Sequence, residues 1–254
     1  VIPVVVHVMH TGGNSNISDE QVFDALRIIN EDFKKLNSDT AAVIDEFQGI
    51  AANVGVEFRL AKLDPEGNCT KGITCTYTTL TNDAGENVKA VVGWDPRMYL
   101  NIWVVSNIAS GAGGYSYYPG SAPNADANAG IVIRSSQFGS IGAANGGNFS
   151  SRSLTHEIGH YLDLPHTWGS TNDNHVEENC DADDYVEDTP NTIGSNLGCI
   201  LAQNTCGSLD NVQNYMDYSS CAKMYTEGQR TKMRTALETG YIWSNAARNN
   251  LPTE

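Results

Sequence analysis

In residues 156–166 the chain reads His156-Glu157-Ile158-Gly159-His160-Tyr161-Leu162-Asp163-Leu164-Pro165-His166. His156 and His160 are one helical turn apart, so on an α-helix both imidazoles project from the same face and can reach one ion. Glu157 lies beside them, where a carboxylate can take a proton from an attacking water. His166 cannot lie on that helical face, so the chain has to leave the helix and turn back. Three neutral imidazoles leave the fourth position of a tetrahedral zinc ion open, which is typical of a catalytic site.

The residues around this run predict a helix that packs against a core. Leu154, Ile158 and Leu162 repeat every four residues and form an apolar stripe. The first two histidines then lie on a neighbouring face, as at the floor of a cleft. We therefore predict a zinc site with the three histidines as ligands and Glu157 as the catalytic base.

The same run resembles the metzincin signature H-E-x-x-H-x-x-G-x-x-H, and residues 156–169 are most similar to the pappalysin family. One position differs from most metzincins, because Asp163 stands where they have glycine. Glycine there allows a left-handed backbone as the chain leaves the helix. Asp and Asn are the other residues that tolerate this conformation best. We therefore expect Asp163 to carry the turn that delivers His166.

A second motif, Asn214-Tyr215-Met216-Asp217-Tyr218, resembles the pappalysin Met-turn. The resemblance implies that Met216 forms an apolar floor beneath the zinc ligands and that Tyr218 stabilises the oxyanion during peptide hydrolysis. It also covers residues 2–10 and 100–105, and so it spans most of the chain.

The resemblance implies a metzincin fold of the α+β (α/β-like) class. This fold has a twisted five-stranded mixed sheet with two long helices, an antiparallel edge strand along the cleft, and an irregular C-terminal subdomain stapled by disulfides. An N-terminal zinc-binding subdomain would cover residues 1–166. A C-terminal subdomain, which contains the Met-turn, would cover residues 167–254, and the two together would form one catalytic domain. Local patterns predict strands in ranges 1–10, 54–63, 100–106, 115–118 and 130–135 and helices in ranges 18–37, from 151 and from 226.

Composition narrows the partners and the compartment. The chain has 254 residues and a net charge of −15, which disfavours nucleic acid and anionic membrane surfaces as partners. No apolar run is long enough to span a membrane, and there is no signal peptide. The chain starts in a strand-like segment without an initiator Met. A start of this kind is typical of a mature enzyme cut from a pre- and pro-segment. Together with the pappalysin resemblance, these features predict a secreted enzyme that is made as a zymogen, is monomeric after removal of its pro-segment, and acts on polypeptides.

Acidic residues are concentrated between Asp173 and Asp188. They form either a solvated surface loop or a calcium site, because Ca²⁺ prefers such oxygen ligands. Pappalysins bind calcium in the matching loop. The resemblance implies calcium ligands at Asp183, Asp184, Val186 and Asp188.

The six cysteines form no zinc-ribbon spacing, and in a secreted chain disulfides are the default. Cys69 and Cys75 are close enough in sequence to bridge one loop. The other four allow three pairings by arithmetic alone. The pappalysin resemblance favours the interlaced pairs Cys180–Cys206 and Cys199–Cys221.

The function predicted from all these features is zinc-dependent hydrolysis of peptide bonds in proteins. Three alternatives stay open: a zinc hydrolase with a different third ligand, a non-catalytic secreted zinc- and calcium-binding adhesion module, and a calcium-binding structural protein. The last leaves the histidine run unexplained. Some pappalysins prefer basic residues just after the scissile bond, using acidic residues that follow the Met-turn tyrosine. Here the corresponding segment, Ser219-Ser220-Cys221-Ala222-Lys223, holds no carboxylate, so it does not predict a preference for basic residues.

Overall fold

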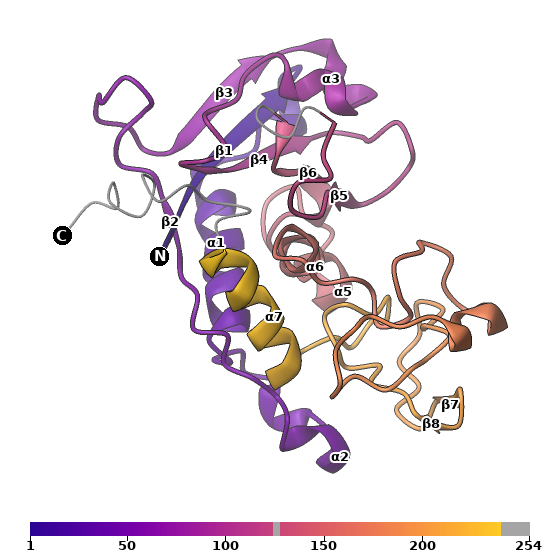
Figure 1. Cartoon of the computed structure of the whole chain (residues 1–254). Coiled ribbons are helices and arrows are strands. Elements are labelled where there is room, and N and C mark those ends of the chain that lie inside the picture. The colour runs from indigo at the N-terminus through magenta and orange to yellow at the C-terminus, as the bar shows by residue number, and fades with distance from the viewer. Residues whose placement is uncertain (124–127, 240–254) are drawn as a thin grey trace.

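A mixed β-sheet packed on helices forms the body of the protein (Figure 1). The computed structural model describes residues 1–123 and 128–239. The strands lie in the order β2-β1-β4-β6-β5, and β3 also pairs with β1. Their bounds are Ile2–His10 for β1, Phe58–Leu60 for β2, Ile73–Tyr77 for β3, Leu100–Val105 for β4, Gly114–Ser116 for β5 and Ile131–Arg134 for β6. All pairs are parallel except β5 with β6, so the predicted mixed sheet with an antiparallel edge strand is confirmed.

Six strand segments fill five positions of this sheet because β2 and β3 share one side of β1. Residues 2–4 of β1 pair with β2, and residues 6–10 pair with β3. The strand predicted over 54–63 is therefore shorter than expected. The amides of Val54 and Gly55 donate to the carbonyl of Phe33 at the end of the first helix instead of joining the sheet.

The helices of the described residues are α1 (Asp19–Phe33), α2 (Asp45–Gln48), α3 (Glu86–Lys89), α5 (Gly147–Ser151), α6 (Ser153–Tyr161) and α7 (Glu227–Glu238). Ser18 caps α1 by accepting from the amide of Gln21. The helix ends before the predicted Asn37, because Lys35 has a left-handed backbone (φ 53°) and the amide of Leu36 turns back to the carbonyl of Glu31. Thr226 and Gln229 form a complete capping box on α7.

One face of the sheet carries the main core, which lies against α1 and α6 (Figure 1). Alternate residues of the central strands, such as Val6 and Ile102, are fully buried against Ile29 of α1 and Ile158 of α6. Trp103 points to the other face, where it packs in a smaller cluster with residues of α3. Burial on both faces explains why the central strands consist almost entirely of apolar residues.

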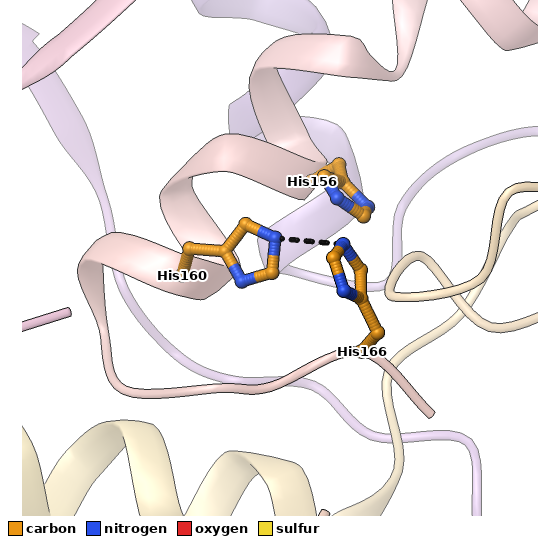
Figure 2. Close-up of side chains that lie close together, drawn as sticks. All are labelled: His156, His160 and His166. Atoms are coloured by element: carbon orange, nitrogen blue, oxygen red, sulfur yellow. Dashed lines mark hydrogen bonds between the residues drawn. The ribbon is translucent and has the colours of Figure 1, made fainter. Parts of the chain in front are cut away.

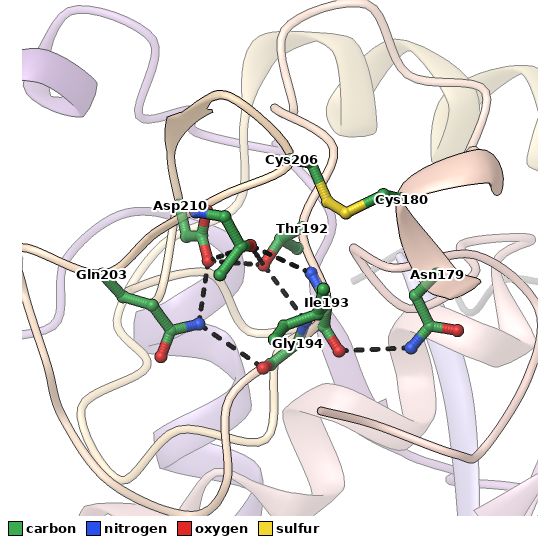
Figure 3. The surroundings of a disulfide bond; sticks show 9 residues. Asn179, Cys180, Thr192, Ile193, Gly194, Gln203, Cys206 and Asp210 are labelled. Atoms are coloured by element: carbon green, nitrogen blue, oxygen red, sulfur yellow. Dashed lines mark hydrogen bonds between the residues drawn. A yellow bond between two sulfur atoms is a disulfide. The ribbon is translucent and has the colours of Figure 1, made fainter. Parts of the chain in front are cut away.

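The C-terminal region has little regular structure beyond the short β7 (Asn204–Thr205), β8 (Ser208–Leu209) and α7. Both interlaced disulfides are present, Cys180–Cys206 and Cys199–Cys221. Figure 3 shows buried Asp210 beside the first of them, with its carboxylate accepting from Thr192 and Gln203. These disulfides and hydrogen bonds stabilise loops that lack the regular backbone hydrogen bonds of helices and sheets.

The predicted bridge between Cys69 and Cys75 is not formed, and both thiols are free and exposed. The backbone of Cys69 pairs with that of Leu63 in an isolated antiparallel β-bridge. Cys75 lies in β3, where it pairs with Val8 of β1. The two cysteines are close in sequence but belong to different backbone pairings. In the described part of the chain, no helix has the length and apolar character needed to cross a membrane.

Candidate active site

The run that contains the three histidines begins in α6 and leaves it through a tight helix end. The amide of Asp163 donates to the carbonyl of His160, and the amide of Leu164 donates to that of Gly159. These are the two bonds of a Schellman motif, which needs one left-handed residue. Asp163 takes that conformation with φ 76°. The chain then reverses, and this brings His166 next to His160.

Each imidazole is oriented by a backbone carbonyl. The Nδ1 atom of His156 lies 2.7 Å from the carbonyl oxygen of Tyr215, and that of His160 lies 2.7 Å from the carbonyl oxygen of Leu164. The Nδ1 atom of His166 lies 2.9 Å from the carbonyl oxygen of Thr171. A carbonyl can only accept, so each Nδ1 carries the proton and each Nε2 presents a lone pair. Figure 2 shows the three rings facing one another.

This arrangement fits a zinc ion. The Nε2 atoms of His160 and His166 lie 3.1 Å apart, joined by the dashed line in Figure 2, and one ligand atom from each of the three histidines lies within 4.8 Å of the others. Two buried lone pairs at this distance repel each other unless a cation lies between them. Tetrahedral nitrogen ligands of zinc are separated by about 3.4 Å. Among the described residues, no other group of at least three His, Cys, Asp or Glu side chains is close enough to hold a metal.

Burial sets the protonation state of these groups. It lowers the pKa of His156 to about 4 and that of His160 to about 3, and it lowers the pKa of His166 well below its usual value. The rings are therefore neutral, as metal ligands must be. Burial also raises the pKa of Glu157 to about 8. A nearby cation favours the carboxylate form of such a group, which is the form that accepts a proton.

Glu157 and His156 line a cleft of about 410 Å³. The walls come from the segment before β5, from α5 and α6, and from the Met-turn with the residues after it. Gly114 of β5 lies directly over the carboxylate, because a Cβ atom there would be 3.0 Å from both Cγ and Oε1 of Glu157. The glycine leaves the room that this carboxylate occupies.

Two residues of the Met-turn pack against α6 and the histidines. Met216 is fully buried, and it packs so closely on Gly159 that a Cβ atom added to this glycine would lie only 2.3 Å from the Sδ atom. Tyr218 contacts the histidines, with its ring 4.9 Å from that of His166 and 5.5 Å from that of His156. Burial and the nearby charge of Glu157 raise the pKa of Tyr218, so its hydroxyl keeps its proton and can donate.

Adding one methyl group at Gly159 should disturb this packing. Gly159→Ala ordinarily stabilises a helix by about 1 kcal/mol, but overpacking against Met216 costs about 1–3 kcal/mol. We expect a net loss of stability and weaker zinc binding, measured by urea unfolding and zinc titration. Met216→Ala supplies the control, because it removes the colliding sulfur. The double variant should then lose less than the sum of the single losses, and strict additivity would contradict the assignment.

Two of the carboxylates predicted as calcium ligands accept hydrogen bonds from different parts of the chain. Asp183 accepts from the amide of Tyr185, and Asp188 accepts from Thr226 and from the amide of Gly228 at the start of α7. The carboxylates of Asp183, Asp184 and Asp188 are not gathered into one cluster.

Asp184 itself is buried, and burial raises its pKa to about 7. Both of its carboxylate oxygens and the carbonyl of Val186 lie 2.7 Å from the hydroxyl of Thr189. The amide of Val186 also donates to Oδ1 of Asp184 at 3.0 Å. The single hydroxyl proton of Thr189 still cannot serve all three acceptors at once, so this group of oxygens is short of donors.

Several functional contacts were not predicted from the sequence. Trp168 stacks on His166 with ring centroids 4.3 Å apart, and Gly114 packs on Glu157. Arg152 donates to the hydroxyl of Tyr215, whose carbonyl holds His156. The position of Trp168 two residues after the third histidine was a weak signal. The carbonyl partners gave none, because every residue has a carbonyl group.

Comparison with known proteins agrees with this geometry. Residues 82–238 match the sequence model of peptidase family M43, described as pregnancy-associated plasma protein-A. An extracellular metalloprotease of Arthroderma otae is 27% identical over 244 residues, which cover 93% of this chain and 77% of that protein. An extracellular metalloprotease of Pyricularia oryzae is 29% identical over 247 residues, covering 91% of this chain and 73% of that protein.

Solved structures are similar over nearly the whole chain. Mature mirolysin of Tannerella forsythia, in complex with a cleaved peptide, has a TM-score of 0.86 and 35% identity, covering 98% of this chain and 96% of that one. A promirolysin mutant from the same organism has a TM-score of 0.85 and 35% identity, covering 95% of this chain and 82% of that one. The chain therefore belongs to peptidase family M43, the pappalysins, and is an extracellular metalloprotease.

Proposed function

We propose that this metalloprotease is an endopeptidase that cleaves polypeptides with Glu157 as general base. The observation that carries the proposal is the convergence of three oriented Nε2 atoms beside a carboxylate that faces a cleft. His156, His160 and His166 would hold the zinc ion. When bound, zinc supplies Lewis acidity, which polarises the scissile carbonyl and lowers the pKa of water toward neutrality.

The chain's own groups then handle the protons and the developing charge. Glu157 takes a proton from the attacking water and passes it to the leaving amine. Tyr218 donates its hydroxyl proton in a hydrogen bond to the oxyanion of the substrate. Met216 and Asp163 act through structure: the first packs beneath α6, and the second shapes the turn to His166.

The proposal is tested by digesting a peptide library and identifying the cut bonds by mass spectrometry, with zinc content measured on the same sample. We expect one zinc ion per chain, internal cleavage, loss of activity on chelation and recovery when zinc is returned. His166→Ala should lose zinc. Cleavage that persists in a zinc-free sample would refute the proposal, and zinc retention by His166→Ala would favour a different third ligand.

We also propose that the protein is made with a pro-segment and acts as a monomer once this segment is removed. The similarity to promirolysin supports the first part. In this proposal residues 1–166 and 167–254 are two subdomains of one catalytic domain. The main core supports the assignment of both subdomains to a single catalytic domain, since it joins residues of both. Residues 240–254 of the second subdomain lie outside the described residues.

A further proposal is a calcium ion in the acidic loop, bound by Asp184, the carbonyl of Val186 and the hydroxyl of Thr189. The three oxygens around this one hydroxyl support it, because Ca²⁺ takes such oxygen ligands. Asp183 and Asp188 would add negative charge to the loop.

Removing calcium should lower thermal stability without removing zinc. A ligand present at 100 times its Kd stabilises the folded state by about 2.7 kcal/mol. We therefore expect a calcium-selective chelator to lower Tm by several degrees in zinc-saturated buffer. Asp184→Asn should abolish this difference, whereas Asp181→Asn, at an exposed position in the same loop, should retain it. A Tm that does not respond to calcium in the unaltered protein would contradict the site.

A further inference from the structure

Two exposed apolar side chains lie on the cleft beside Glu157. Phe149 of α5 is 43% exposed and Leu197 is 58% exposed, and both line the cleft. Leu197 also has a left-handed backbone (φ 58°), a conformation that costs energy for a residue other than glycine. The Cys199–Cys221 disulfide ties the loop of Leu197 to Ala222, a third apolar lining residue. The fold thus holds apolar side chains at the mouth and wall of one cavity.

The charged groups of this cleft are already engaged elsewhere. Arg152 forms ion pairs with Asp32 and Asp39. Arg134 donates to Asn107, which is not a lining residue, and its buried Nε atom has no hydrogen-bond partner.

The remaining lining carboxylate apart from Glu157 belongs to Asp217. This residue is only 4% exposed, so it presents little surface to a ligand, although only its Oδ2 atom accepts from Thr167 and its buried Oδ1 atom has no hydrogen-bond partner. Among the described lining residues, no exposed carboxylate is left to select a basic side chain, and the one lining cation without an ion pair is the half-buried Arg134.

The edge strand indicates which part of a bound peptide enters the cleft. The segment Gly111–Gly114 lines the cleft, and Gly114 lies over Glu157. Farther along, Tyr118 contacts His160 with ring centroids 5.6 Å apart. β5 pairs antiparallel with β6 on one side, and its other side is the edge of the sheet.

A peptide that adds antiparallel to this free edge runs from Tyr118 toward Gly111. When the carbonyl of its scissile bond lies at Glu157, the part of the peptide after that bond runs along Gly111–Gly114, which line the cleft. The residue immediately after the scissile bond therefore faces the cleft. We propose that this cleft binds an apolar side chain, such as Leu or Phe, of the residue immediately after the scissile bond. The proposal rests on the proposed endopeptidase function. Burial of the substrate side chain against Phe149, Leu197 and Ala222 supplies the selectivity.

The test uses peptides that differ only at this residue, which is Leu, Ala, Lys or Glu. The cut bond is confirmed by mass spectrometry, and kcat/KM is measured for each peptide. We expect the Leu peptide to exceed each of the others by at least about tenfold, as an apolar pocket discriminates on this scale. A preference for Lys or Glu would overturn the inference while leaving the endopeptidase function intact. Failure to cleave any peptide, or equal cleavage by Glu157→Gln, would refute the function itself.

Variants at the mouth of the cleft make the assignment residue-specific. Leu197→Asp places a carboxylate there, so the ratio of kcat/KM for the Leu peptide to that for the Lys peptide should fall at least about tenfold. Ile200→Asp is the matched control, because Ile200 is 62% exposed in the same loop but does not line the cleft. Phe149→Ala should reduce cleavage of the Leu peptide more than that of the Ala peptide. Equal ratios for Leu197→Asp and Ile200→Asp would overturn the inference.

Discussion

Replacing Glu157 by glutamine is expected to abolish peptide hydrolysis and to leave zinc bound. Glutamine has nearly the same shape, so it fits under Gly114, but it cannot accept a proton. General base catalysis contributes about 10²–10⁴-fold to a rate. The zinc ligands themselves are unchanged in this variant. We therefore expect kcat to fall by roughly a thousandfold or more, measured with a cleaved peptide, while metal analysis still finds one zinc ion per chain.

The control for this variant is Glu46→Gln, which makes the same chemical change at an exposed position on α2. It should retain both full activity and zinc. If Glu157→Gln loses zinc together with activity, the carboxylate is needed to assemble the site and its role as a base is unproven. If the variant cleaves peptides at the original rate, Glu157 is not the base at all.

The structural features that the sequence predicted well are those that depend on residues close together in the chain. The four-residue spacing of His156 and His160 places both on one face of α6, and the apolar stripe that includes Ile158 lies in the core. Asp163 was expected to be left-handed because few residues other than glycine tolerate that conformation, and its φ is 76°. In each case a local physical constraint acts on residues that are close in the sequence.

Long-range pairings were predicted less well because they depend on which distant segments meet. β2 and β3 both pair with the same side of β1. This arrangement depends on the path of the whole chain, and the residues in the range 54–63 do not predict it. The bridge predicted for Cys69 and Cys75 was wrong for the same reason, since nearness in sequence says nothing of the strand register that separates them. The two C-terminal disulfides were predicted from family resemblance, because arithmetic alone left three pairings open.

The ion network beneath the active site was also invisible in the sequence. Arg152, at the start of α6, pairs with Asp32 of α1 and with Asp39, and it donates to the hydroxyl of Tyr215. Thr155 donates to the second oxygen of Asp32 at 2.6 Å. The Asp32 side chain is fully buried, whereas that of Arg152 is 13% exposed. The network joins α1, α6 and the Met-turn, and Tyr215 carries it to His156.

Arg152→Met should therefore destabilise the protein strongly at neutral pH. Removing one partner of a buried ion pair leaves an uncompensated charge and costs about 3–5 kcal/mol. Chemical unfolding of the zinc-loaded protein measures this loss. Arg27, whose side chain is 52% exposed, pairs with Asp24 and Glu31 and provides the comparison, since a pair made by a solvent-exposed side chain contributes at most about 1 kcal/mol. A loss in Arg152→Met no greater than that in Arg27→Met would show that the network contributes little.

The dependence of this loss on pH separates an electrostatic cause from lost packing. Burial raises the pKa of Asp32 to about 6, and the charge of Arg152 opposes this shift. A raised pKa means that the folded state binds the proton more tightly, so the contribution of Asp32 to stability is largest at low pH and is lost as pH rises through 6. Without Arg152 the pKa rises further. The difference in the free energy of unfolding between Arg152→Met and the unaltered protein should therefore increase from pH 5 to pH 7.5. Adding Asp32→Asn to the Arg152→Met variant should remove most of this difference. A difference that is constant with pH would assign the loss to packing of the arginine stem instead.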